Sequence, residues 1–268
     1  MKIALGLEYD GQAFHGWQSQ PHGNTLQDVL EVALAAIAGL PVRTHCAGRT
    51  DTGVHALAQV AHFETDAVRP VSAWVRGVNA HLPAGVAVNW AVPVADDFHA
   101  RFCAIRRTYC YWLLNRPVRP ALFAGKVGWC HAPLNVNAMS SAAQQLCGEH
   151  DFSAFRAAEC QAKSPVKTLH AIEISQHDDL ICIQLSANGF LHHMVRNIVG
   201  ALVYVGLGRY PAAWLGELLR QRQRARAAPT YAAAGLYFSG VEYGQEWRLP
   251  GSGRIIVSHP WLAGSDRS

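Results

Sequence analysis

The stretch AGRTDTGVHA, residues 47–56, places a single carboxylate, Asp51, in a run of glycines and threonines, two residues after Arg49. Glycine supplies the backbone freedom that a tight turn needs, so Gly48 and Gly53 would make a turn here without an ion pair. A guanidinium beside an acid favours the ionised form of that acid. The stretch therefore predicts a functional carboxylate on a loop. An Arg49–Asp51 ion pair that only pins the loop is the structural alternative.

The neighbours of Asp51 narrow the chemistry that this acid can perform. Between Arg43 and His62 it is the only acid, which disfavours a magnesium or calcium site. The triplet Asp-Thr-Gly is also found in aspartic proteases, but that chemistry needs two carboxylates that share a proton, and no second such triplet occurs. A homodimer could supply the second acid. An ionised, oriented carboxylate is better suited to attack an electrophilic carbon, so we favour a nucleophile.

Composition indicates an ordered globular protein. The chain has 268 residues, of which 50% are hydrophobic and 16% charged, and its net charge of +4 favours polyanionic partners only weakly. Seven cysteines without a C-x-x-C pair fit neither a disulfide framework nor a zinc site. The longest apolar stretch, residues 198–208, is too short to span a bilayer. We expect a cytoplasmic protein that binds neither membrane nor metal.

Hydrophobic periodicity predicts alternating strands and helices. Period-two alternation predicts a strand at residues 2–7, and an apolar stripe predicts a helix at 24–37, capped by Asn24 or Thr25 and ended by Gly39. Further strands are predicted at 59–63, 86–94, 107–114, 169–175, 180–186 and 236–241, and further helices at 74–82, 136–147, 191–202 and 214–226. This α+β pattern predicts an N-terminal subdomain over 1–105 with the catalytic loop, a C-terminal subdomain over 106–248, and an unassigned tail over 249–268.

Seven segments, in order along the chain, resemble the tRNA pseudouridine synthase A family. GRTDTGVHA (48–56) is the most characteristic, and its Thr52 departs from the alanine common in the family. The other six are YDGQAFHGWQ (9–18), GVNAHLP (77–83), DDFHARF with the following RRTYCY (96–111), HDFSAFRAAECQ (150–161), GFLHHMVRNIVG (189–200) and AAAGLYF (232–238). The resemblance covers roughly residues 2–243.

The resemblance implies a fold and an activity. The fold is a mixed, mainly antiparallel sheet flanked by helices, built from two similar subdomains around a central basic cleft, in a homodimer. The activity is a cofactor-free isomerisation in the anticodon stem-loop of tRNA. Uracil is detached from its ribose, rotated and rejoined through C5, and the targets are uridines 38, 39 and 40.

Four residues acquire roles through the same resemblance. Asp51 matches the nucleophile, which attacks either uracil C6 or ribose C1′. Arg49 matches the arginine that assists base extrusion. Tyr109 matches the active-site tyrosine, which stacks on the flipped base or also moves the C5 proton, and Arg196 matches the arginine that pairs with the nucleophile. Apolar residues surround Arg196, so its burial would be costly without an acid.

The remaining candidates concern RNA binding. Adjacent histidines on a helix point in different directions, so His192 and His193 are predicted to pack or to contact phosphate rather than bind a metal. A non-catalytic tRNA-binding factor is a second hypothesis. The cations predicted to contact phosphate are Arg69, Arg76, Arg101, Arg106, Arg107, Lys163 and Lys167. The run Arg220, Arg222, Arg224 and Arg226 fits a solvated helix face as well as an RNA patch.

Overall fold

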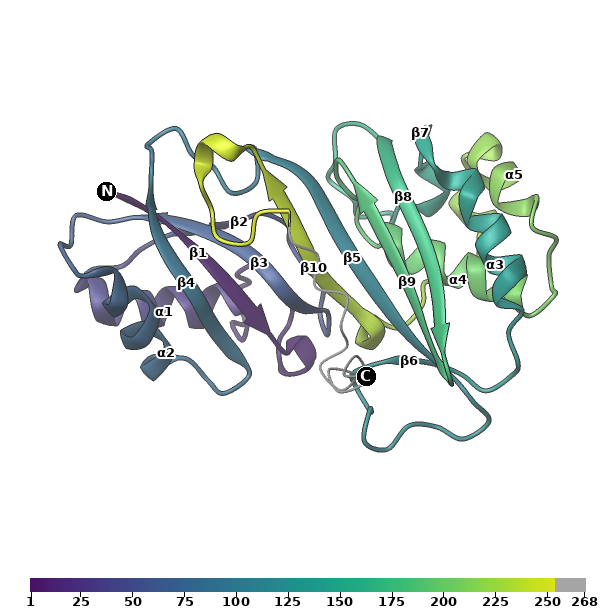
Figure 1. Ribbon diagram of the computed structural model, residues 1–268, viewed down its shortest axis with the longest axis horizontal. Coiled ribbons are helices and arrows are strands. Elements are labelled where there is room, and N and C mark those ends of the chain that lie inside the picture. The colour runs from purple at the N-terminus through teal and green to yellow at the C-terminus, as the bar shows by residue number, and fades with distance from the viewer. Residues whose placement is uncertain (254–268) are drawn as a thin grey trace, which may run out of the picture.

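The computed structural model describes residues 1–253, which form one ten-stranded sheet with helices at both ends of it (Figure 1). The strands are β1 (Lys2–Tyr9), β2 (Thr44–Cys46), β3 (His55–Glu64), β4 (Val86–Val94), β5 (Ala104–Asn115), β6 (Gly128–Cys130), β7 (Gly148–Asp151), β8 (Val166–His177), β9 (Leu180–Ala187) and β10 (Leu236–Tyr243). Of the predicted tail, 249–253 are described and include a turn, and 254–268 lie outside the described residues.

The sheet repeats one strand order twice. Its main path runs β4-β1-β3-β10-β5-β9-β8-β7, so the triplet β4-β1-β3 is followed by the equivalent triplet β10-β5-β9. In each triplet the first strand in sequence lies in the middle and is antiparallel to both neighbours. The triplets meet where β10 pairs in parallel with β3, at Tyr237–His55 and Phe238–Ala56. The mixed, mainly antiparallel α+β sheet is confirmed.

The helices begin and end where the sequence supplies capping residues. Helix α1 (Leu26–Ala38) starts with a capping box between Thr25 and Asp28, and Gly39 ends it with φ 79°. The others are α2 (Val78–His81), α3 (Val136–Ala143), α4 (Met194–Gly206) and α5 (Trp214–Gln221). In Figure 1, α1 and α2 lie at the end of the sheet that holds β4, and α3, α4 and α5 at the end that holds β8.

Most predicted elements are confirmed, with corrections at their ends. The strands predicted over 169–175 and 180–186 are β8 and β9, which form an antiparallel hairpin, and Asp178 in its turn has φ 51°. The helix predicted over 74–82 is instead a π-helical turn at Ala73–Gly77 that leads into α2. The helix predicted over 214–226 ends at Gln221, because Arg222 adopts a left-handed conformation with φ 55°.

Most buried side chains of both halves form one continuous core, and a smaller separate cluster includes Trp112, Leu114 and Tyr237. The continuous core contains Leu5 and Phe63 from the first strand triplet and Leu185 and Ile198 from the second half, all at most 2% exposed. A close-packed interior of this kind has low compressibility, so β3 and α4 provide rigid supports for the loops that precede them. Within residues 1–253, no helix combines the length and apolar character needed to cross a bilayer.

Candidate active site

The loop between β2 and β3 carries Asp51, and buried polar side chains hold it in place. Gln59, on β3 and fully buried, donates from Nε2 to the Gly48 carbonyl at 2.7 Å. The Thr50 hydroxyl lies 2.8 Å from the hydroxyl of Tyr9, and the Thr50 carbonyl accepts from Trp17 N at 2.9 Å. Because buried polar groups are costly without partners, these bonds favour one loop conformation.

Two glycines allow the loop to approach its neighbours closely. A Cβ on Gly48 would lie 2.9 Å from the ring of Phe238 and 3.5 Å from the Tyr109 hydroxyl. Gly16 has φ 82°, and a Cβ there would lie 2.7 Å from the Thr50 carbonyl oxygen. Any side chain at Gly16 would therefore combine backbone strain with a clash against the catalytic loop.

Three cationic or potentially cationic side chains surround the carboxylate of Asp51. Arg196 Nη1 lies 3.2 Å from Oδ2, His192 Nε2 lies 3.2 Å from Oδ1, and His193 Nε2 lies 3.4 Å from Oδ2. The carboxylate keeps 23% of its side-chain surface exposed. Asp51 is thus oriented by three groups and still accessible to a substrate.

The predicted acid partner for Arg196 is confirmed. Arg196 lies in the first turn of α4, where its Nε donates to the Tyr231 carbonyl at 2.8 Å and its Nη1 to Asp51. The pair joins residues 145 positions apart in the sequence. The prediction that Arg49 pairs with Asp51 is wrong: Arg49 is exposed and, within residues 1–253, makes no ion pair with it.

The expectation that His192 and His193 lie on a helix and point in different directions is wrong, and the reason is the backbone. Both residues precede α4, and His193 caps it in the left-handed region with φ 61°. The chain is not helical here, so the adjacent rings, whose centroids are 4.0 Å apart, both reach the same carboxylate. The His192 carbonyl accepts from Ala157 N at 3.0 Å, and its N–H donates to Cys160 Sγ at 3.4 Å. These contacts fix the turn.

Burial decides the charge of His193. It lowers the pKa of His193 below the ordinary value of 6.5, and the neighbouring His192 and Arg196 act in the same direction against the opposing effect of Asp51. His193 is therefore neutral at pH 7. A neutral imidazole protonated at Nε2 donates a hydrogen bond to Asp51 without adding a second full positive charge beside Arg196.

Tyr109, on β5, lies close to the catalytic loop in an aromatic setting. Its ring makes edge-to-face contacts with Phe190 and Phe238, with centroids 5.0 and 5.1 Å apart. Burial, the nearby Tyr9 and the charge of Asp51 all raise its pKa far above 10, so the phenol is protonated in the free protein. Tyr111, two residues further along β5, is fully buried and donates to the Ala232 carbonyl at 2.9 Å, so it has a packing role.

Two of the predicted RNA-facing arginines have structural roles instead. The guanidinium of Arg107 donates to the carbonyls of Ala47, Arg101, Ala104 and Asn188, which ties the start of the catalytic loop to β5. Arg224 donates to the Ala228 carbonyl, Asn197 Oδ1 and Thr230 Oγ1. The five bonds of Arg107 give its guanidinium a structural role, and the three bonds of Arg224 fix the orientation of its side chain.

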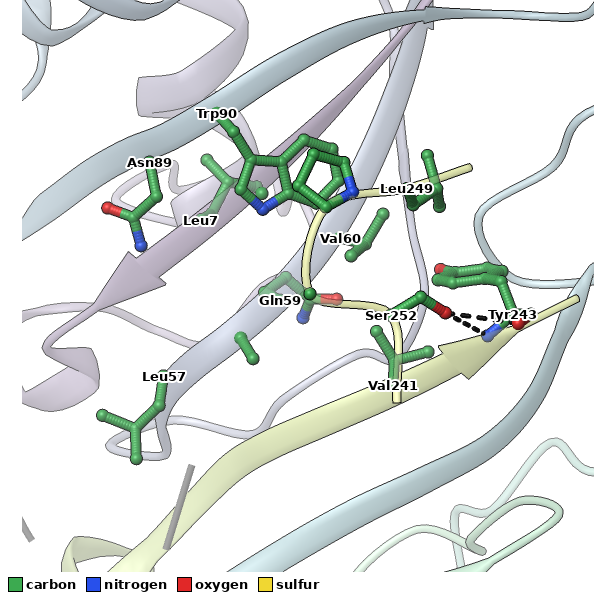
Figure 2. A pocket seen from close by; sticks show the side chains of 14 residues that line it. Leu7, Leu57, Gln59, Val60, Asn89, Trp90, Val241, Tyr243, Leu249 and Ser252 are labelled. Carbon is green, nitrogen blue, oxygen red and sulfur yellow. Dashed lines mark hydrogen bonds between the residues drawn. The ribbon is translucent and has the colours of Figure 1, made fainter. Parts of the chain in front are cut away.

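A separate pocket of about 280 Å³ lies beside the catalytic loop (Figure 2). Leu7, Val60, Trp90 and Leu249 give it an apolar lining, and Ser252 Oγ accepts a hydrogen bond from Tyr243 N at 2.9 Å at its edge. Gln59 is among the lining residues, but neither Asp51 nor any of its ion-pair partners is. Asp51 and its ion-pair partners therefore lie outside this pocket.

Comparisons with known proteins agree over nearly the whole chain. A family model described as tRNA pseudouridine synthase matches residues 7–103 and 142–244. The chain is 62% identical to tRNA pseudouridine synthase A of Aromatoleum aromaticum, over 96% of this chain and 97% of that protein. Proteins of the same name from Chromobacterium violaceum and Dechloromonas aromatica are 61% and 58% identical, each over 93% of this chain and over 96% and 95% of theirs.

These matches and the α+β sheet place the chain among the pseudouridine synthases, which are isomerases. Within that class it belongs to the tRNA pseudouridine synthase family, whose members convert uridine to pseudouridine in tRNA. The matched segments include the loop of Asp51, both histidines and Arg196. The aspartic protease alternative is thereby wrong.

Proposed function

We propose that the chain converts uridines 38, 39 and 40 of the tRNA anticodon stem-loop to pseudouridine, with Asp51 as the nucleophile. One observation supports this most strongly. Asp51 is the acid of the family-like loop, and it is oriented by Arg196, His192 and His193 while 23% of its side chain stays exposed. An anionic oxygen that is held in place and still accessible is what covalent attack requires.

The isomerisation balances without any cofactor. The Asp51 carboxylate bonds to uracil C6 or to ribose C1′, and the C1′–N1 bond breaks. The base rotates, a C1′–C5 bond forms, and the bond to Asp51 is released. C5 then loses its proton and N1 gains one, so the product is an isomer of the substrate. Because nothing is oxidised or reduced, we propose that neither a cofactor nor a metal is needed.

In this proposal the residues around Asp51 orient the carboxylate, stack on the base and assist its extrusion. Arg196 holds Oδ2 and complements the negative charge of the carboxylate, together with the N-terminal end of α4. Tyr109 stacks on the everted uracil, and its phenol, which lies beside Gly48 of the Asp51 loop, exchanges the proton at C5. Arg49 is exposed on the same loop and can occupy the space that the flipped nucleotide leaves in the stem.

RNA binding involves groups beyond the four site residues. We propose a basic cleft around Asp51 that contacts backbone phosphates, with Arg101 and Lys163 as candidate contacts. We also propose a cytoplasmic homodimer, as the family resemblance implies. A folded stem-loop is recognised mainly by shape and backbone, so the weak net charge of +4 is sufficient if the cations face one surface.

Release of tritium from C5-labelled uridine in tRNA tests the proposal. Wild-type protein should release the label with or without a chelator, and mapping should place pseudouridine at positions 38–40. Asp51→Asn should bind tRNA and release no label. Asp178→Asn is the matched control, because Asp178 sits in the exposed β8–β9 turn and asparagine tolerates its positive φ. If the wild type binds tRNA but releases no label, the chain is instead a non-catalytic binding factor.

A further inference from the structure

We propose that Asp51, His192 and His193 form a binding site for a transition-metal cation such as Zn²⁺, and that a metal bound there inhibits the protein. The inference goes beyond the proposed function, in which no metal takes part. It concerns a cation that competes with the substrate and not one that the reaction needs. It rests on the juxtaposition of a loop of the first half with the turn before α4 in the second half.

The ligand atoms are already spaced for a tetrahedral ion. Asp51, His192 and His193 each offer one atom, and these atoms all lie within 4.8 Å of one another. The two carboxylate-to-imidazole distances are 3.2 and 3.4 Å. In a tetrahedral zinc site with bonds of about 2.0–2.1 Å, neighbouring ligand atoms are about 3.3 Å apart. These distances run to different oxygens, Oδ1 for His192 and Oδ2 for His193, so binding requires the carboxylate to turn and the two imidazole nitrogens to adjust their separation. The proton on Nε2 of His193 must also move to Nδ1, because a ring nitrogen binds a metal only in its unprotonated form.

The types of ligand select the metal. Two imidazoles with one carboxylate suit Zn²⁺, Cu²⁺ or Ni²⁺, whereas Mg²⁺ and Ca²⁺ prefer sites made of oxygen ligands alone. The backbone contacts of His192 and the left-handed φ of His193 hold both rings in place before any metal arrives. The exposed fraction of the His192 side chain, 38%, leaves the site open to an ion from solvent.

Arg196 limits how tightly this site can bind. Its guanidinium lies 3.2 Å from Oδ2 of Asp51, so a metal must share the carboxylate with an existing positive charge. Three protein ligands also leave one tetrahedral position for water. A reversible inhibitory site therefore fits better than a permanently occupied one. While the carboxylate donates electron density to a metal it is a poor nucleophile, so the metal must leave before uridine can react.

Metal binding can be measured without RNA, which separates this inference from the proposed function. Zn²⁺ is titrated calorimetrically into the full chain, and Co²⁺ replaces it for a visible absorption spectrum, which reports a tetrahedral nitrogen and oxygen site. We expect one site per chain. His192→Ala and His193→Ala should each weaken Zn²⁺ binding at least about 10-fold, since each removes a direct ligand. Thermal melting of each variant without metal verifies that it is folded.

The exposed pair His15 and His22, with ring centroids 5.0 Å apart, provides the matched control. His22→Ala should leave Zn²⁺ affinity unchanged. In the label-release assay, Zn²⁺ should inhibit the wild type, and a chelator should restore its full rate. The proposal is overturned if folded His192→Ala and His193→Ala bind Zn²⁺ as the wild type does, or if the wild type binds none.

Discussion

Replacing Gln59 by leucine tests whether a buried amide holds the catalytic loop in its working conformation. Gln59 is fully buried on β3, and its Nε2 donates to the Gly48 carbonyl at 2.7 Å and to the Tyr9 hydroxyl at 3.3 Å. Its Oε1 accepts from Gly48 N at 3.4 Å. Leucine has a similar size and makes none of these bonds, so both main-chain groups of Gly48 lose their side-chain partner.

The expected cost follows from those two groups. A buried donor or acceptor left without a partner costs about 1–3 kcal/mol, and Gly48 is only half-buried, so water offsets part of the loss. We expect Gln59→Leu to lower the free energy of unfolding by about 2–3 kcal/mol. For a chain of this size that corresponds to a fall in Tm of roughly 4–6 °C. A displacement of the loop by about 1 Å would lower the single-turnover rate about 100-fold.

Thermal melting and single-turnover label release measure the two effects. Gln176→Leu is the matched control, because Gln176 is exposed on β8 and bonds only the Asp178 carbonyl in its own turn. It should change the unfolding free energy by less than about 0.5 kcal/mol and leave the rate unchanged. A Gln59→Leu protein with wild-type turnover would refute the idea that this amide sets the position of Asp51, whatever its Tm.

Three further substitutions test the surrounding groups. Tyr109→Phe keeps the stacking ring and removes the phenol that exchanges the C5 proton in the proposed reaction, so it should keep tRNA affinity and lose about 100-fold in single-turnover rate. Wild-type turnover would leave the ring a stacking role only. Arg196→Lys keeps the positive charge, but a single ammonium cannot bond both Asp51 and the Tyr231 carbonyl as the guanidinium does. Turnover should therefore fall with little change in far-UV circular dichroism. An unchanged rate would contradict the pairing role. Burial, with two neighbouring histidines and a lysine, lowers the pKa of His62 from 6.5 to about 3. The unfolded chain therefore takes up a proton there that the folded chain does not, and stability should fall as the pH drops from 6.5 toward 3. The free energy of unfolding, measured by urea titration at each pH, should fall less steeply for His62→Gln than for the wild type. An equally steep fall would exclude His62 as the cause.

The sequence predicted the regular elements well where they are long. Helix α1 was predictable because its apolar stripe, its capping threonine and its terminal glycine all indicate the same helix. The strands β2, β6 and β7 have three or four residues, too few for any periodicity to emerge. Helix α5 was overextended because nothing local marks Arg222 as left-handed.

The sequence indicated which residues belong to the candidate site better than it indicated which of them contact one another. Arg196 amid apolar residues did indicate an acid partner, and that acid is Asp51. The contacts of His192 and His193 were missed because the helix was expected to start before them, and one left-handed residue changes where both rings point. Gln59 carried a usable signal, since a polar residue in an apolar strand beside a loop needs a partner in that loop.

The repeated strand order explains why the site needs both halves of the chain. In the first triplet, the loop before β3 carries Asp51, and in the second, the segment after β9 carries His192, His193 and Arg196. The parallel pairing of β3 with β10 brings these segments together, because it sets the start of β3 beside the start of β10. Tyr231, just ahead of β10, then holds Arg196 through its carbonyl. A single triplet would present Asp51 without its cation, so the candidate site lies where the two triplets meet, and neither triplet alone could orient the carboxylate.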